Sequence, residues 1–145
     1  MAFPPKLDEL GAVNIMLGTI GLSPISSLTG TTTADVSLAQ KILNETSRAV
    51  QSSGWEFNTE CDYPLAPDGA GTINIADNLL RVDVPNTGMT TVDVTQRGSR
   101  LYDKKGRTYT FTQTLKADVI LALPYDELPP SARHYIAVRA ARVFQ

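Results

Sequence analysis

The stretch L-N-E-T-S-R-A-V-Q-S-S-G-W-E-F-N, residues 43–58, marks the point at which the chain changes from helix to sheet. Gly54 can adopt the left-handed conformation that closes a helix without steric cost, so we expect it just past a helix end. Trp55 and Phe57 stand two residues apart, the spacing that places two side chains on one face of a strand. The stretch therefore predicts a helix that closes at Gly54, followed by a strand that carries both rings as core aromatic residues.

Two amphipathic helices are predicted before this junction. The first covers about residues 8–20, where apolar residues recur at three- and four-residue steps, and Gly21 is expected to end it. The second covers about residues 34–53, with Thr33 or Asp35 as its N-cap. Its apolar stripe consists of Val36, Leu38, Ala39, Ile42, Leu43, Ala49 and Val50. A stripe of this width predicts contact with both a neighbouring helix and the sheet.

After Gly54 the apolar pattern changes to the two-residue period of strands. The candidate strands are rich in Val, Ile, Thr and Tyr and are separated by Gly, Pro, Asn and Asp. They cover residues 72–75, 79–84, 91–96, 100–103, 108–114 and 116–123. Turns are predicted at residues 85–88 and at residues 104–106. This pattern indicates an antiparallel sheet of modest size.

A third helix is predicted at the C-terminal end of the chain. Pro130 or Ser131 begins it, because the first helical position needs no backbone N–H donor. Its buried stripe is predicted to contain Ile136, Ala140 and Val143. The arginines expected to point away from that stripe are Arg133, Arg139 and Arg142. The helix has no Gly, Asn or Pro to end it, which indicates a longer molecule.

Together these elements predict an α+β fold in a single domain that spans residues 1–145. In its helical part, residues 7–54 and 130–145, the two N-terminal helices and the C-terminal helix pack as a bundle. Its β part, residues 55–124, is an inserted antiparallel β-sheet. A chain of 145 residues is long enough to bury a sizeable core without disulfides or metals.

The composition is that of an ordinary globular protein, with 42% apolar and 19% charged residues. No segment approaches the roughly 18 apolar residues that a membrane helix needs. The N-terminus lacks the basic and then apolar pattern of a signal peptide. Cys61 is the only cysteine and cannot form an intrachain disulfide, which favours assembly in a reducing cytoplasm.

The formal charge is unevenly distributed along the chain. Residues 1–95 hold 4 basic and 11 acidic side chains, whereas residues 96–145 hold 9 basic and 4 acidic side chains. Surfaces of opposite sign favour head-to-tail contacts between subunits. The alternative is that the two parts of the chain form solvent-exposed faces of different charge that contact no other subunit.

A basic run lies around the turn predicted at residues 104–106. It consists of Arg97, Arg100, Lys104, Lys105 and Arg107. Tyr102 and Tyr109 lie close by and would allow base stacking, but the acidic pI of about 5.3 argues against a dedicated nucleic-acid binder. Docking to an acidic neighbouring subunit fits the run better. A solvated hairpin whose lysines protect an exposed edge is the alternative.

Residues suited to catalysis or metal binding are scarce. The single histidine, His134, and the single cysteine, Cys61, cannot supply a zinc site, and no phosphate-binding loop occurs. We predict neither cofactor nor metal. The acidic pairs are Asp8 with Glu9, Glu60 with Asp62, and Asp126 with Glu127. Paired carboxylates keep a glycan hydrolase as the alternative function, although turns and helix starts explain the first and last pairs better.

Residues 43–58 resemble the tail tubular protein A family, the head-to-tail adaptors of short-tailed phages (podoviruses). Further similar positions follow in the same order along nearly the whole chain. They are Ala12-Val13-Asn14, Ile20-Gly21, Pro24, Ser27-Leu28, Ala34-Asp35, Ile42-Leu43-Asn44, Arg48, Gln51-Ser52, Arg97-Gly98, Tyr102-Asp103 and residues 125–129. Residues 59–95 match only loosely. Family members continue for some tens of residues past the position of Phe144, into a region that helps to dock the portal.

The resemblance implies a structural virion protein of the tail and not an enzyme. Its subunits would form a ring, a dodecamer, between the portal protein and the tail nozzle (tail tubular protein B). The ring would surround the channel for DNA ejection, offer docking surface to tail fibres and assemble in the bacterial host cytoplasm. The residues that we expect at partner interfaces are Arg97, Arg100, Lys104, Lys105, Arg107, Arg139 and Arg142.

Overall fold

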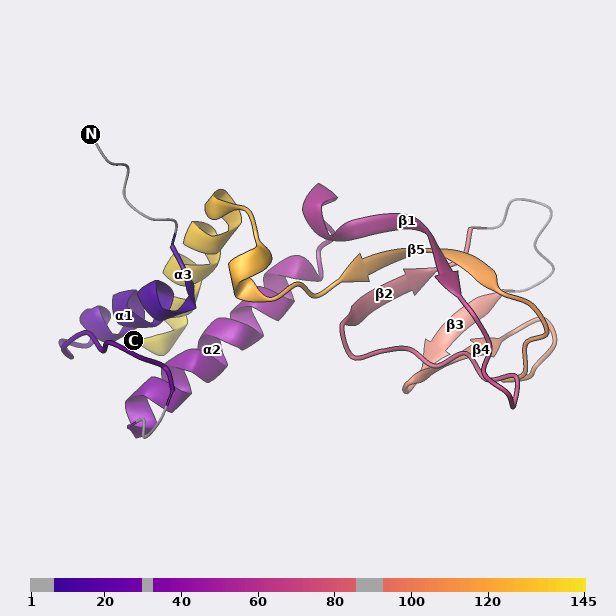
Figure 1. Cartoon of the computed structure of the whole chain (residues 1–145), viewed down its shortest axis with the longest axis horizontal. Helices are drawn as coiled ribbons and strands as arrows, with labels where there is room; N and C mark the ends of the chain where they lie inside the picture. The colour runs from indigo at the N-terminus through magenta and orange to yellow at the C-terminus, as the bar shows by residue number, and fades with distance from the viewer. Residues whose placement is uncertain (1–6, 30–32, 86–92) are drawn as a thin grey trace. The chain divides into compact units, whose positions relative to one another are not determined.

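The computed structural model describes residues 7–29, 33–85 and 93–145. The chain divides into two compact units (Figure 1). The helical unit comprises Met1–Ser53 and Leu123–Gln145, and the β unit comprises Gly54–Ala122. Within the described ranges, three α-helices are combined with antiparallel sheets, which confirms the predicted α+β class.

The two N-terminal helices lie where the sequence predicts them. Helix α1 (Glu9–Thr19) is capped by Asp8, whose Oδ1 accepts a hydrogen bond from the Gly11 N–H at 2.7 Å. Helix α2 (Ala34–Gln51) is capped by Thr33, so the first of the two candidate caps is the one used. Gly21, just past α1, has a φ of +79°, as its predicted role at the helix end requires.

Each of the three helices contacts the other two, including α3 (Pro130–Phe144). The core of the helical unit contains Ala12, Val13, Met16, Leu17, Val36, Ala39, Leu43, Val50, Ile136, Ala137, Ala140 and Ala141. Leu38, predicted in the stripe of α2, is 48% exposed, because two residues along a helix turn it away from Val36. Val143, predicted to be buried, is 62% exposed in the last turn of α3.

A buried glutamine at the end of α2 binds the chain segment that leads back into the helical unit. Gln51 is 1% exposed, and its side-chain amide forms two hydrogen bonds with the backbone of Leu123. Nε2 donates to the Leu123 carbonyl at 3.1 Å, and Oε1 accepts from the Leu123 N–H at 2.8 Å. Nε2 also donates to Oγ of Ser47 at 2.9 Å. One side-chain amide thus provides hydrogen-bond partners for both backbone groups of Leu123, which lies in neither a helix nor a strand.

Arg133 on α3 has a structural role that differs from the prediction that it points away from the core. Its Nε donates to the Leu128 carbonyl at 2.7 Å, and its Nη1 donates to the Leu7 carbonyl at 3.0 Å. Its Nη2 donates to the carbonyl of Asp126. The guanidinium therefore ties the residue before α1 to the segment before α3.

The β unit contains two antiparallel sheets within its described residues. Strand β5 (Leu115–Leu121) is central in the first, with β1 (Thr59–Leu65) on one side and β2 (Leu79–Asp83) on the other. The second sheet pairs β3 (Val94–Arg97) with β4 (Arg100–Asp103). The hydrophobic cluster shared by the two sheets contains Leu65, Ile73, Ile75, Leu79, Leu101, Phe111, Leu115, Ala117 and Val119.

In the described ranges, two of the predicted strands are absent, and one observed strand was not predicted. Residues 72–75 and 108–114 form isolated bridges and no strands, through Thr72 with Thr110, Asn74 with Arg100, and Asp103 with Thr108. Strand β1 was missed, because its sequence T-E-C-D-Y-P-L contains a proline and no run of alternating apolar residues. Of the predicted turn at residues 85–88 and the strand predicted from residue 91, residues 86–92 lie outside the described residues.

The junction after α2 also differs from its prediction. Gly54 has the expected positive φ of +80°, and a Cβ there would lie 2.8 Å from Cδ1 of Ile120. Residues Glu56–Asn58 form a 3₁₀ turn and no strand, and Trp55 is 46% exposed. The rings of Trp55 and Phe57 stack with centroids 6.3 Å apart, so they lie together without forming a core.

The two units do not separate the charges found in the two parts of the sequence. The helical unit holds 6 basic and 6 acidic residues, and the β unit holds 7 basic and 9 acidic residues. The basic residues 96–145 are divided between the two units, so neither unit has the strong excess of one charge that the two parts of the sequence show.

In the described part of the chain, no helix is long and apolar enough to span a bilayer.

Candidate functional site

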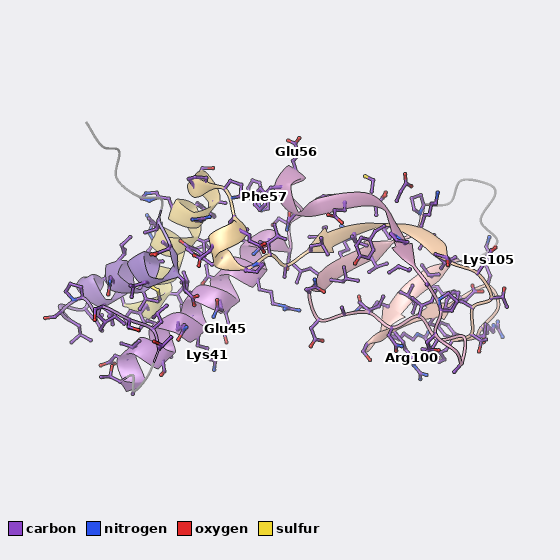
Figure 2. The ribbon with its side chains drawn as sticks, in the orientation of Figure 1. Lys41, Glu45, Glu56, Phe57, Arg100 and Lys105 are labelled. Carbon is purple, nitrogen blue, oxygen red and sulfur yellow. The ribbon has the colours of Figure 1, made fainter. Side chains whose placement is uncertain are left out.

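The basic run occupies two turns at opposite ends of β4. Arg97 and Arg100 are paired across the two-residue turn Gly98–Ser99, which closes the β3–β4 hairpin. Gly98 has a φ of +65°, the conformation that such a turn requires at its first position. The predicted turn at residues 104–106 is present, but it follows β4 and is not the tip of that hairpin. Figure 2 labels Arg100 and Lys105, one from each turn.

Two arginines and two tyrosines form a stacked group on the β3–β4 hairpin and the segment that follows it. Cζ of Arg97 lies 3.8 Å from the ring centroid of Tyr102, and Cζ of Arg100 lies 3.7 Å from that of Tyr109. The two tyrosine rings have centroids 4.9 Å apart at 55°. We call these four residues the arginine–tyrosine cluster. Cation–π stacking holds each guanidinium plane and leaves its N–H edge available to a carboxylate.

The arginines of this cluster are exposed. Within residues 7–29, 33–85 and 93–145, neither Arg97 nor Arg100 has an acidic side chain within 4.0 Å. Their charges are therefore not compensated by an ion pair in the described chain. A planar guanidinium with a fixed orientation is well suited to bidentate recognition of carboxylate or phosphate.

Asp103, the one acidic residue within the basic run, supports the second turn. It is 7% exposed, and its Oδ1 accepts from the Lys105 N–H at 3.0 Å and from the Asp93 N–H at 3.3 Å. A Cβ on Gly106 would lie 2.9 Å from its Oδ2, which explains the glycine. The carboxylate is thus used by the backbone. The basic residues of the turn, Lys104, Lys105 and Arg107, are exposed around it.

Arg139 and Arg142 belong to a partly apolar stripe on the outer face of α3. They line a surface hollow of about 370 Å³ together with Tyr135 and Val138. Tyr135 is 53% exposed and Val138 is 39% exposed. We call these four residues the α3 outer stripe. Their spacing along α3, at i, i+3, i+4 and i+7, places all four side chains on one face of the helix. Sequence reasoning found the arginines but missed Tyr135 and Val138, although the spacing was visible.

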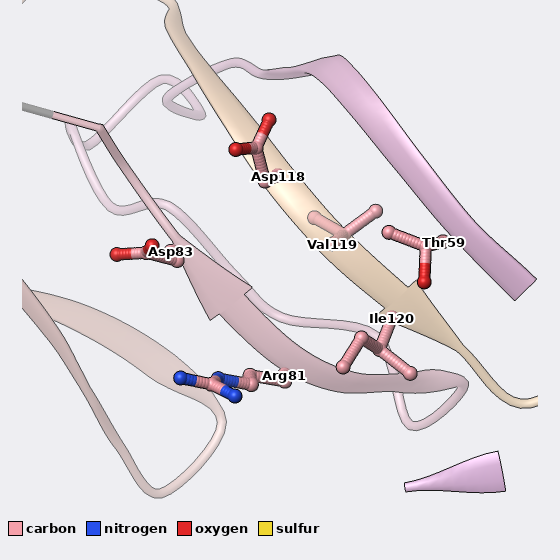
Figure 3. A pocket seen from close by; sticks show the side chains of 6 residues that line it. All are labelled: Thr59, Arg81, Asp83, Asp118, Val119 and Ile120. Carbon is pink, nitrogen blue, oxygen red and sulfur yellow. The ribbon is translucent and has the colours of Figure 1, made fainter. Parts of the chain in front are cut away.

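A second hollow, of about 220 Å³, lies on the three-stranded sheet, where it is lined by residues of β1, β2 and β5 (Figure 3). Its lining residues are Thr59, Arg81, Asp83, Asp118, Val119 and Ile120. Asp83 and Asp118 are directly opposite each other in the register of β2 and β5. Sequence reasoning missed this pair, because two strands far apart in the chain bring it together.

The acidic pairs considered for catalysis are used by the fold where their contacts are described. Asp8 caps α1, and Oδ1 of Asp126 accepts from the Glu9 N–H at 3.0 Å. Glu60 and Asp62 are exposed around an irregularity in β1. Within the described ranges, no group of three or more His, Cys, Asp or Glu side chains is arranged to hold a metal ion.

Cys61 and Tyr125 are the titratable groups near these features with shifted pKa values. Cys61 is exposed on β1, and the negative charge of Asp118 is the largest cause that raises the pKa of its thiol. Burial raises the pKa of Tyr125 to about 12, and its hydroxyl donates to the Arg133 carbonyl at 2.6 Å. Neither shift produces a nucleophile that would be active at neutral pH.

Comparison with known proteins agrees with a structural role. The family model described as tail tubular protein matches residues 10–145. Tail tubular protein A of Klebsiella phage KP34 is 28% identical over 132 residues, which cover 90% of this chain and 68% of that protein. The match includes all three helices and both sheets. The chain therefore belongs to the tail tubular protein family and is a structural component of a phage tail.

Proposed function

We propose that this tail protein is a head-to-tail adaptor, which forms a ring of identical subunits, a dodecamer, between the portal protein and the tail nozzle. Both units act in it as a single adaptor domain. The arginine–tyrosine cluster is the observation that carries the proposal. It presents two oriented, uncompensated guanidiniums on the surface, and such groups are enriched at protein interfaces.

A ring requires two different contact surfaces on every subunit, because each copy contacts one neighbour at each side. The β unit offers the arginine–tyrosine cluster and, at the other end of β4, the turn of Lys104, Lys105 and Arg107. The helical unit offers the α3 outer stripe with Arg139 and Arg142. Burying the apolar surface of Tyr135 and Val138 in such a contact stabilises it by about 25 cal/mol per Å². These surfaces serve neighbouring subunits, the portal, the nozzle and tail fibres.

The channel of such a ring passes genomic DNA without sequence-specific binding. The chain has a formal net charge of −2, and DNA is repelled by acidic surface. A lumen of acidic side chains would therefore let DNA slide during ejection.

Sedimentation velocity of the purified chain, with and without portal protein, tests the proposal. We expect a large assembly that dissociates as salt is raised, because exposed charges are screened. Reversing Arg100 and Lys104 to Glu should weaken the assembly, whereas reversing the exposed Glu56 to Lys should leave it intact. A chain that stays monomeric at physiological salt in both conditions would overturn the proposal.

A further inference from the structure

Each of the two sheets of the β unit contains one pair of like-charged residues that are directly opposed on neighbouring strands. Asp83 of β2 is opposite Asp118 of β5, and Arg97 of β3 is opposite Arg100 of β4. Like charges at directly opposed positions destabilise an antiparallel pair. The direct opposition itself therefore costs stability in the isolated chain at both places.

Both pairs face away from the shared core of the two sheets. Val82 and Val119 pack toward the core, so their neighbours Asp83 and Asp118 point to the other face, where they line the hollow in Figure 3. Leu101 is fully buried, and the adjacent Arg100 therefore lies on the outer face of the hairpin. Each pair is thus placed where another molecule can reach it.

The aspartates are as uncompensated as the arginines. Among the described residues, no basic side chain lies within 4.0 Å of Asp83 or Asp118, although Arg81 lines the same hollow. The charge of Asp118 acts on Cys61 beside it and raises the pKa of that thiol. An open hollow with two carboxylates and no ion pair is an acceptor for two cationic groups.

We propose that Arg97 and Arg100 of one copy of this chain bind Asp83 and Asp118 of the next copy, in a head-to-tail contact that repeats around the assembly. The inference rests on the proposed ring and names the faces that join its subunits. Directly opposed residues of antiparallel strands have Cβ atoms about 4.5–5.5 Å apart, so both pairs share one spacing. Two guanidinium–carboxylate pairs can therefore form side by side.

The tyrosines make this contact specific. Tyr102 and Tyr109 already hold the guanidinium planes, so less side-chain freedom is lost on binding than for unsupported arginines. The donor face and the acceptor face are different surfaces of the same chain. Such a contact is heterologous and continues from copy to copy, as a ring requires.

A charge-exchange experiment tests the pairing. One chain carries Arg97→Asp and Arg100→Asp, and a second carries Asp83→Arg and Asp118→Arg. Each alone meets only like charges at the contact, so we expect the concentration for half-assembly to rise at least about tenfold. An equal mixture of the two chains restores complementary contacts at every interface, and assembly should return to near the level of the unmodified chain.

Two further chains serve as controls. A chain with Glu56→Arg and Glu60→Arg changes the net charge as much as the aspartate reversal and should assemble normally. A second control chain carries Lys104→Asp and Lys105→Asp. Mixing it with the chain that carries Asp83→Arg and Asp118→Arg should not restore assembly. Circular dichroism and thermal unfolding of each variant check that it is folded, and rescue in the mixture checks this independently.

The outcomes separate the pairing from the proposed function. If the unmodified chain does not assemble with or without portal, the ring itself is wrong. If it assembles and both reversed chains also assemble normally, the pairing is wrong and the ring stands. Failure of folded reversed chains to rescue each other, or loss of portal binding alone after arginine reversal, would also overturn the pairing.

Discussion

The side chain of Asn58 holds the end of β5 through a hydrogen bond from its Nδ2 to the carbonyl of Leu121 at 3.0 Å. Its Oδ1 accepts from the N–H of Trp55 at 2.8 Å, and the residue is 1% exposed. Asn58, and not the tryptophan before it, is therefore the buried residue that fixes the segment after Gly54.

Replacing Asn58 with Ala should lower the free energy of unfolding by about 2 kcal/mol or more, because two backbone groups lose their buried partner. Urea unfolding followed by circular dichroism measures this change. Glu56→Ala, an exposed change in the same turn, should stay within about 0.5 kcal/mol of the unmodified chain. Equal effects of the two substitutions would show that Asn58 does not fix the turn.

The helices could be predicted from the sequence because their signals are local. Asp8 and Thr33 cap helices whose apolar spacing is regular, and Gly21 follows the first of them. The sheets could be predicted only in part, because pairing depends on residues far apart in the chain. Strand β1 shows the difference, since its place beside β5 is not recorded in its own polar sequence.

The same distinction holds for the candidate site. The basic residues were visible as a run, but the stacking of Arg97 on Tyr102 depends on the register of β3 and β4. The opposition of Asp83 and Asp118 depends on the pairing of β2 with β5. The charged residues can be read from the sequence, whereas the distances between their side chains depend on how the strands pair.

Stability should depend on pH in the alkaline range through Tyr125. Its pKa is raised from 10.0 to about 12 in the folded chain by burial, so the folded state holds the proton more tightly than the unfolded state. The stabilisation is complete below pH 10 and is lost as the pH rises toward 12. Unfolding midpoints measured across this range should fall less for Tyr125→Phe; an identical pH dependence would contradict the assignment.

Arg133→Ala should destabilise the helical unit by about 2 kcal/mol, since three backbone carbonyls lose a charged donor. Arg139→Ala on the exposed face of the same helix provides the matched control and should change stability by less than about 0.5 kcal/mol. Thermal unfolding of both variants measures the contrast. The absence of any contrast would mean that the guanidinium of Arg133 is solvated.

The reactivity of Cys61 should report the charge of Asp118. Because that charge raises the pKa of the thiol, less thiolate is present near neutral pH and alkylation is slow. Asp118→Asn should lower the pKa toward its ordinary value and speed the reaction with a maleimide. Asp77→Asn, on the loop before β2, should not change the rate. A rate unaffected by Asp118→Asn would show that the two side chains do not interact.

We propose that this tail protein assembles head to tail into a ring on the portal protein. Electron microscopy of the purified chain mixed with portal protein would show such a ring directly. We predict closed rings of one fixed subunit number, stacked on one end of the portal and sharing its axis. Portal particles without added density, beside a chain that remains monomeric, would contradict the claim.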